Sequence, residues 1–141
     1  MTVKIKNSYV IRLAHGVDLL DALREQCRQR AIRMGVLSVI GAVHGATIGY
    51  YDQKEKAYQN KNIAGELEIA SCTGNISLKD GDIMVHAHLL LSDATGTTYG
   101  GHLLSPTTLF AAEAFIQELD GDPLEPEYDS VTGLFLWRMK R

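Results

Sequence analysis

Three of the five histidines in the chain lie within one short region, and histidine is a common ligand for metal ions at neutral pH. His86 and His88 are two residues apart in Met84-Val-His-Ala-His-Leu, and His102 follows in Gly100-Gly-His-Leu. On a strand, residues i and i+2 point to the same face, with Cα atoms about 7 Å apart. A strand over this segment would therefore let His86 and His88 converge on one ion.

Whether His102 joins them depends on the loop before its strand. If Ala94, Thr95 and Gly96 form a three-residue loop, His88 lies directly opposite His102 and the two share a face. A loop of only two residues shifts the pairing by one and moves His102 to the other face. The longer loop needs a left-handed last residue, which glycine provides without steric strain. The turn chemistry therefore favours convergence.

Three neutral imidazoles with an open fourth position are typical of zinc, which can lower the pKa of a bound water or polarise a carbonyl. Another divalent metal is the alternative. Glu113 is the candidate carboxylate for completing or assisting the site, because an unpaired carboxylate in its apolar surroundings would be costly. Glu113 could instead face outward on a strand, and the histidines could be hydrogen-bonded residues at a strand or subunit contact. No catalytic residue is assigned.

The other two histidines, His15 and His44, have no such partners and are interpreted as structural, although His44 could approach a cleft. Gly100 and Gly101 indicate either a close backbone approach beside the site or a bulge.

The two cysteines are too few for a disulfide framework and lack the short paired spacing of a thiolate zinc site. Cys27 is expected to fill a buried helix face, and Cys72 is left open. A reducing compartment follows as the simpler assumption.

One amphipathic helix is expected from Asp18 to about Met34, capped by Asp18 and ended by Gly35. Most other segments have strand character. The predicted strands are Tyr9 to Leu13, Val36 to Tyr51, Glu66 to Leu78, Asp82 to Ser92, Thr97 to Leu104 and Gly133 to Lys140. Phe110 to Leu119 is ambiguous between helix and strand, and strand is preferred. The segment from Asp120 to Glu127 is expected to be a long loop.

The predicted fold class is therefore α/β of the α+β kind, a mostly antiparallel sheet with one main amphipathic helix. A length of 141 residues fits one compact domain over residues 1–141. The formal net charge of −3 argues against nucleic-acid binding by bulk electrostatics. Neither a signal peptide nor a membrane-spanning apolar stretch is visible, which predicts a cytoplasmic protein with no membrane partner.

Taken in order, several short motifs resemble the PPC (plants and prokaryotes conserved) domain family over nearly the whole chain. They are Leu19-Leu-Asp-Ala-Leu, Val39-Ile-Gly-Ala-Val, Gly49-Tyr-Tyr-Asp, Gly65-Glu-Leu-Glu-Ile, Gly74-Asn-Ile, His86-Ala-His-Leu, Tyr99-Gly-Gly-His-Leu, Tyr128-Asp and Thr132-Gly-Leu. The resemblance implies a homotrimer and a metal site, most simply zinc, at His86, His88 and His102. It also implies a fold similar to that of acetolactate decarboxylase, a zinc enzyme.

Two functions follow from the resemblance. The first is a trimeric metal-binding protein with a candidate DNA-associated or regulatory role, because plant relatives join this domain to AT-hook segments. The chain has no Arg-Gly-Arg core of an AT-hook and no basic patch, so DNA is a partner by association only. The alternative is a zinc-dependent lyase or hydrolase acting on a small carbonyl or carboxylate substrate. A purely structural trimer is a third interpretation.

Overall fold

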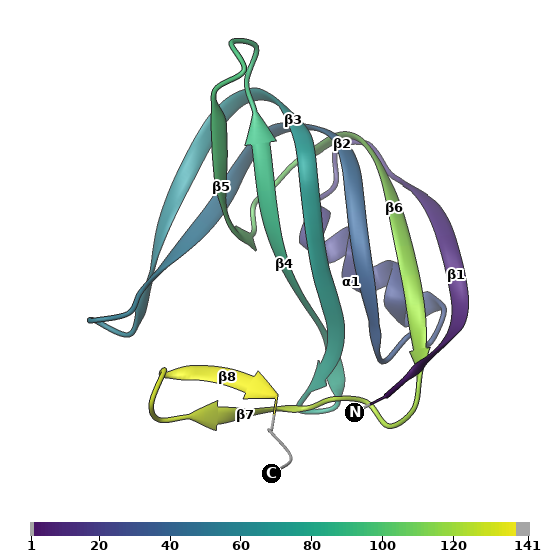
Figure 1. The fold of residues 1–141 in the computed structure, drawn as a ribbon. Helices are drawn as coiled ribbons and strands as arrows, with labels where there is room; N and C mark the ends of the chain where they lie inside the picture. Colours follow the sequence, from purple (N-terminus) through teal and green to yellow (C-terminus); the bar gives the residue numbers. More distant parts are fainter. Residues whose placement is uncertain (1, 138–141) are drawn as a thin grey trace.

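The computed structural model describes residues 2–137, which form one sheet, one helix and a terminal hairpin (Figure 1). The elements are β1 (Lys4–Leu13), α1 (Leu19–Gln29), β2 (Gly35–Asp52), β3 (Ala57–Lys79), β4 (Asp82–Ser92), β5 (Thr98–Leu104), β6 (Leu109–Asp120), β7 (Pro126–Asp129) and β8 (Leu134–Trp137). The six longer strands pair in the order β1-β6-β2-β3-β4-β5, and β7 pairs with β8. Every pairing is antiparallel, which confirms the predicted fold class.

The strand β2 pairs with β5 in addition to β3 and β6, and this third pairing bends one side of the sheet into a closed ring. Residues Thr47–Gly49 of β2 pair with His102–Leu104 of β5, although β5 is also the partner of β4. The strands β2, β3, β4 and β5 therefore form a continuous circuit of hydrogen-bonded neighbours. The two pairings of β5 overlap at His102, which has a partner on each side.

The helix α1 covers one face of the sheet and the other face is left open (Figure 1). On β4 the side chains of Val85, Ala87, Leu89 and Leu91 are buried, whereas His86 and His88 between them are exposed. On the helix, Leu19, Leu23 and Cys27 are fully buried. Burial of each large apolar side chain contributes about 1.5–3 kcal/mol. The period-two alternation of β4 thus assigns its odd-numbered residues to the core and its histidines to the open face.

The helix ends earlier than the sequence predicts, at Gln29 rather than near Met34. Ala31 adopts a left-handed conformation with φ 53°, and the backbone N–H of Ile32 donates to the carbonyl of Cys27 at 2.9 Å. This reversal closes the last turn before Gly35 is reached. Ile32 and Met34 are buried, so the apolar spacing continues into a connection that packs on the core without being helical.

The strand boundaries differ from expectation where the sequence lacks an apolar alternation. The segment from Phe110 to Leu119 is confirmed as a strand, β6. However, β1 begins at Lys4 and β3 at Ala57, earlier than predicted. The first residues of both strands are exposed on both faces, so they show no apolar alternation in the sequence. The predicted loop from Asp120 to Glu127 contains the start of β7, which its two prolines conceal. The last predicted strand extends beyond the described residues.

Over residues 2–137, no helix is long and apolar enough to cross a membrane, since α1 has 11 residues.

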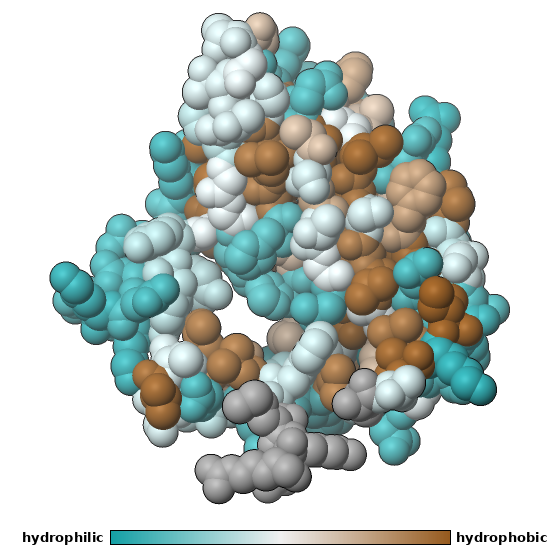
Figure 2. Space-filling model, viewed as in Figure 1, coloured by the Kyte–Doolittle hydropathy of each residue, from teal (hydrophilic) through white to brown (hydrophobic). Residues whose placement is uncertain are grey.

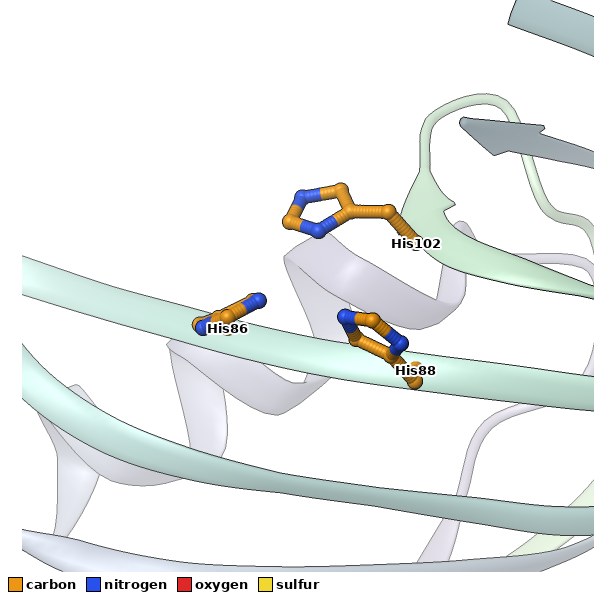
Figure 3. A group of neighbouring side chains, drawn as sticks. All are labelled: His86, His88 and His102. Carbon is orange, nitrogen blue, oxygen red and sulfur yellow. The ribbon is translucent and has the colours of Figure 1, made fainter. Parts of the chain in front are cut away.

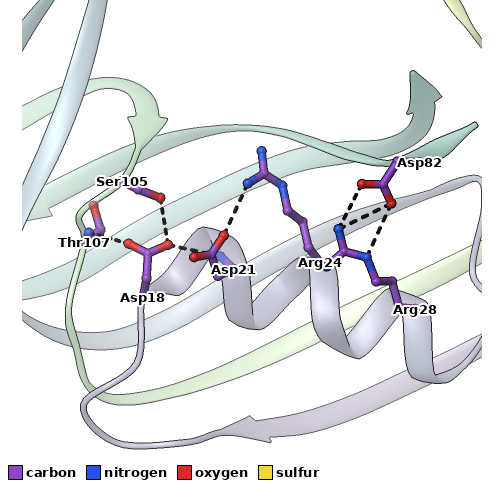
Figure 4. A network of polar contacts seen from close by, with 7 residues as sticks. All are labelled: Asp18, Asp21, Arg24, Arg28, Asp82, Ser105 and Thr107. Carbon is purple, nitrogen blue, oxygen red and sulfur yellow. Dashed lines mark hydrogen bonds and ion pairs between the residues drawn. The ribbon is translucent and has the colours of Figure 1, made fainter. Parts of the chain in front are cut away.

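Asp18 joins the start of α1 to the segment between β5 and β6 (Figure 4). Its carboxylate accepts hydrogen bonds from the backbone N–H of Asp21 at 3.0 Å, the hydroxyl of Ser105 at 2.8 Å and the backbone N–H of Thr107 at 2.7 Å. Asp18 is thus the predicted N-cap, and it also satisfies a donor on a buried residue of another element. This link fixes the chain that leaves β5.

Replacement of Asp18 by alanine should therefore cost more than an ordinary cap. We expect Asp18→Ala to lower the free energy of unfolding by about 1–3 kcal/mol, because the cap is lost and the N–H of Thr107 is left without a partner. Urea denaturation measures this change. Asp21→Ala is the control, since its exposed ion pair with Arg24 contributes less than about 1 kcal/mol. Equal losses in the two variants would contradict the bridging role.

Candidate metal centre

The hairpin between β4 and β5 has the register that the sequence predicts. His88 lies directly opposite His102, and no shift interrupts the ladder to its last pair. The N–H of Asp93 donates to the carbonyl of Thr97 at 3.0 Å, and the N–H of Gly96 donates back to the carbonyl of Asp93 at 2.9 Å. Gly96 has φ 82°, the left-handed conformation that a three-residue loop requires. The predicted loop is confirmed.

The three histidines converge on the open face of the sheet (Figure 3). Their candidate ligand atoms all lie within 4.8 Å of one another. The ring centroids of His86 and His102 are 4.9 Å apart, and His88 lies 5.4 Å from the first and 5.7 Å from the second. Tetrahedral zinc, with Zn–N bonds of about 2.0–2.1 Å, holds its nitrogens about 3.3 Å apart. Small side-chain rotations are enough to reach that geometry.

The electrostatics of the cluster favour the neutral imidazole, the form that binds metals, at His86 and His102. Burial, followed by repulsion from His86 and His88, lowers the pKa of His102 to about 4. The pKa of His86 is also lowered, first by burial and then by His88. The Nδ1 atom of His102 is buried and has no hydrogen-bond partner among the described residues. A metal ion would satisfy this orphaned nitrogen, so the residues present fit the group that the resemblance implies.

Close backbone packing holds His102 in place. A Cβ atom on Gly101 would lie 2.7 Å from the carbonyl oxygen of Gly49 and 3.2 Å from Cβ of Ile48. Only glycine therefore lets β5 approach β2 this closely while it is paired with β4. The close-approach interpretation of Gly101 is confirmed, and the bulge is not present in the β4–β5 ladder.

Two neighbours of the cluster were not predicted from the sequence. The ring of Tyr58 lies 5.1 Å from that of His102, and it also lies 5.1 Å from Tyr51, its cross-strand partner. Asn75 on β3 lies directly opposite His86, and its buried Oδ1 atom has no hydrogen-bond partner among the described residues. That oxygen can accept a hydrogen bond from the His86 ring and so fix its orientation. Tyr58 lies in the part of β3 that the sequence did not indicate as strand, and Asn75 needs the β3–β4 register.

Glu113 does not belong to the cluster, so the expectation that it assists the site is wrong. It is exposed on β6, opposite Arg12 on one side and Ile40 on the other. Strands β2 and β3 separate β6 from β4, which places Glu113 about 14 Å away at the usual strand spacing. The outward-facing alternative therefore holds. Among the described residues, the histidine group contains no carboxylate.

The remaining histidines form a separate aromatic contact. His44 and His15 lie 5.0 Å and 5.6 Å from the ring of Phe110, and Nδ1 of His15 is 2.8 Å from the Phe110 carbonyl oxygen. His44 also lines a hollow of about 300 Å³ with Glu66 and Asp93. It therefore borders a cleft, but not the cleft of the three-histidine group.

Both cysteines belong to the core. Burial raises the pKa of Cys27 to about 11 and that of Cys72 to about 12. These thiols stay protonated at neutral pH, which is unsuitable for a metal ligand.

Comparison with known families now identifies the domain. Residues 1–120 match the family model of the Plants and Prokaryotes Conserved domain, abbreviated PCC or PPC. The chain belongs to this family. A metal-containing protein from Archaeoglobus fulgidus has a similar structure, with 40% sequence identity, a TM-score of 0.93 and coverage of 98% of this chain and 97% of the other. A PPC protein from Pyrococcus horikoshii shares 34% identity and a TM-score of 0.93, with 99% and 96% coverage.

Other relatives carry different names. A protein from Bacteroides thetaiotaomicron that is provisionally named as DNA-binding shares 28% identity, a TM-score of 0.87 and coverage of 99% and 98%. The bifunctional protein GlmU of Synechococcus sp. (strain JA-3-3Ab) is 38% identical over 96 residues, or 67% of this chain. The aligned region is 14% of GlmU, so this PPC chain corresponds to a small part of that protein.

The lowered pKa of His102 predicts a pH dependence of stability in the metal-free protein. Because its folded pKa of about 4 lies below the ordinary value of 6.5, the unfolded state binds more protons between these values. The free energy of unfolding should therefore fall as the pH drops from 6.5 towards 4. We expect His102→Gln to lose less stability over this window than the unmodified chain, as measured by urea denaturation in the presence of a chelator. Identical pH slopes would contradict the desolvated environment of His102.

Proposed function

We propose that this PPC protein is a metal-binding module in which His86, His88 and His102 hold a zinc ion. The observation that carries the proposal is the convergence of three candidate ligand atoms within 4.8 Å, in a cluster where the buried Nδ1 atom of His102 has no hydrogen-bond partner among the described residues. The lowered pKa values of His86 and His102 support it, because neutral imidazoles compete well for a metal against protons. The similar protein from Archaeoglobus fulgidus is named as metal-containing.

The residues in and around the cluster have different roles in such a site. His86 and His88 supply lone pairs from one strand, and His102 supplies the third from its neighbour. Asn75 lies directly opposite His86, where its Oδ1 atom can accept a hydrogen bond from that ring once the ring turns to a metal, and the ring of Tyr58 covers one side of His102. When bound, zinc supplies a Lewis acid with an open coordination position. Three neutral ligands leave the full positive charge of the ion in place, which favours anionic or polarisable oxygen ligands.

A second candidate function is a zinc-dependent lyase or hydrolase that acts on a small carbonyl or carboxylate substrate. The observation that favours it is a cavity of about 440 Å³ whose lining includes His86 and His102. This volume falls in the range of small-molecule sites. A substrate in the cavity would therefore lie beside the open side of the histidine cluster.

Metal analysis tests the proposal directly. Protein purified without a histidine tag should contain, or take up on titration, one zinc ion per chain. His88→Ala should weaken zinc binding at least about 100-fold, since two imidazoles cannot replace three. His44→Ala, an exposed histidine outside the cluster, is the control and should bind zinc unchanged. The absence of zinc from the purified protein, with no uptake in calorimetric titration, would overturn the metal-binding function.

We also propose that the chain forms a homotrimer, as the family resemblance implies, and that the open face of the sheet is the contact between its three copies. Several large apolar side chains are exposed there. They are Val10 at 76%, Ile40 at 51%, and Val36, Leu90 and Phe115 at 42% each. Val10 and Phe115 are direct cross-strand partners, and apolar surface gathers over this region of the open face (Figure 2). A continuous apolar surface of this kind is typical of a subunit interface.

Light scattering coupled to size exclusion measures the assembly. The chain of 15.5 kDa should elute with three times its mass. Phe115→Asp should dissociate the trimer, because a carboxylate would be buried without a partner at the contact. Val131→Asp is the control, since Val131 is 80% exposed in the turn between β7 and β8. A monomer at micromolar concentration would contradict the trimer.

The DNA-associated role remains a prediction from the resemblance and from the names of relatives. The net charge of −3 and the absence of an AT-hook core supply no electrostatic mechanism for it. The geometry of the site therefore supports metal binding better than it supports DNA binding.

A further inference from the structure

The cavity beside the histidine cluster is enclosed by parts of the chain that are far apart in sequence. Its walls come from α1, the β2–β3 hairpin, β4, β5 and β8, and Figure 2 shows it as a hollow between the β7–β8 hairpin and the body of the sheet. Two hydrogen bonds attach the terminal hairpin to the β2–β3 hairpin. Tyr51 donates to the carbonyl of Thr132 at 2.7 Å, and Lys56 donates to the carbonyl of Ser130 at 2.8 Å.

The charge of the cavity is opposite to that of the protein. Its described lining contains Arg24, Lys56 and Lys79 and no carboxylate, whereas the whole chain carries a net charge of −3. Arg24 contacts Asp21 at 3.3 Å in an exposed ion pair, which neutralises little of its charge. Lys56 donates to a neutral carbonyl, and the ammonium of Lys79 lies 4.1 Å from the ring centroid of Phe135. Carboxylates outside the lining lie near the same cations, with Asp82 beside Arg24 and opposite Lys79, and Asp129 near Lys56. The charged side chains of the lining itself are thus cationic, and their counter-ions lie outside the cavity.

Lys79 and the histidine cluster lie at different positions along the β3–β4 ladder. Asn75 is paired with His86, and Lys79 is paired with Asp82 at the hairpin end, so Asn75 and Lys79 share a face of β3. Four residues along a strand span about 13 Å. The cavity thus runs from the imidazoles at one end towards Lys79 at the other.

Between these ends, the lining is apolar. Leucines, aromatic rings and a methionine of the lining come from α1, the strands and the terminal hairpin: Leu20, Tyr51, Tyr58, Met84, Leu134 and Phe135. Such walls accommodate a hydrocarbon or aromatic body and exclude water from it. A fully polar ligand such as a sugar would leave these walls without matching contacts.

We propose that the cavity binds a small organic acid with an apolar body, whose carboxylate is held by Lys79 and Arg24. The opposite end of the ligand then faces His86 and His102. A contact between that end and a metal ion rests on the proposed metal-binding function. A carboxylate has two acceptor oxygens, which two cationic side chains satisfy. A phosphate group would present three, and its additional oxygen would require further donors. Lys79 and Arg24 are thus specificity-determining residues.

Calorimetric titration of zinc-loaded protein with 3-phenylpropionate and with its neutral amide tests the charge recognition. We expect the carboxylate to bind at least about tenfold more tightly than the amide. Lys79→Gln and Arg24→Gln should each weaken carboxylate binding about three- to tenfold and leave amide binding unchanged. Lys79→Arg should retain the preference. Lys61→Gln, a lysine outside the cavity lining, is the matched control. Thermal unfolding checks that each variant is folded.

The outcomes separate this inference from the metal-binding function. Equal binding of acid and amide, or a preference that Lys79→Gln and Arg24→Gln do not reduce, would overturn the inference even if zinc binds. A preference that appears only with zinc and ignores both substitutions would also overturn it, because the carboxylate would then be held by the metal. If zinc does not bind but the preference persists and depends on Lys79, the inference stands and the metal-binding function fails.

Discussion

The site depends on one geometric constraint, which is the alternation of side chains across the β4–β5 hairpin. In β4 every second residue is buried against the helix, and the residues between them include His86 and His88. Because the hairpin pairs His88 with His102, all three imidazoles lie on the same face. A shift of one residue in this register would move His102 into the core and leave two ligands outside. The alternation that buries the odd-numbered residues of β4 therefore also places the histidines on the open face.

The same arrangement makes protonation of His86 and His102 unfavourable. Partial burial and mutual repulsion lower the pKa of His86 and His102, and no carboxylate among the described residues offsets a proton on them. The buried Nδ1 of His102 and Oδ1 of Asn75 each lack a hydrogen-bond partner among those residues. Unsatisfied polar atoms of this kind destabilise a fold unless something binds them. An ion bound at the cluster would therefore raise the free energy of unfolding.

The parts of the fold that the sequence revealed are those where one local rule applies. Strand-type residue patterning predicted β4, and turn chemistry predicted the Gly96 loop. The segment of β6 was ambiguous, and strand was preferred because it follows a run of strands. The end of α1 was missed because buried residues continue beyond Gln29 in a non-helical connection. Tyr58 was missed because the outer part of β3 is exposed and polar.

From the sequence, Glu113 is expected to need a partner, because burial of an unpaired carboxylate costs free energy. This reasoning applies to a different carboxylate of β6. Glu118 is the buried one, and it accepts hydrogen bonds from Lys6 at 2.8 Å, Asn7 at 2.8 Å and Tyr9 at 3.1 Å. Its partners lie on β1, more than a hundred residues away in sequence. The cluster required only neighbouring strands, whereas Glu118 required the long-range pairing of β1 with β6. Short-range pairings were predictable from the sequence, and long-range ones were not.

The ring formed by β2, β3, β4 and β5 has a consequence for the order of folding. The three histidines come from one hairpin, which needs only local contacts, but the ring closes when Thr47–Gly49 meets His102–Leu104 across a long loop. Closing a long loop costs chain entropy, so local hairpins form first and distant pairings later. An ion captured by the hairpin would hold β5 in register before β2 arrives. The cluster would then act as a template for closing the ring, and the ion would bind incompletely folded chains as well as native ones.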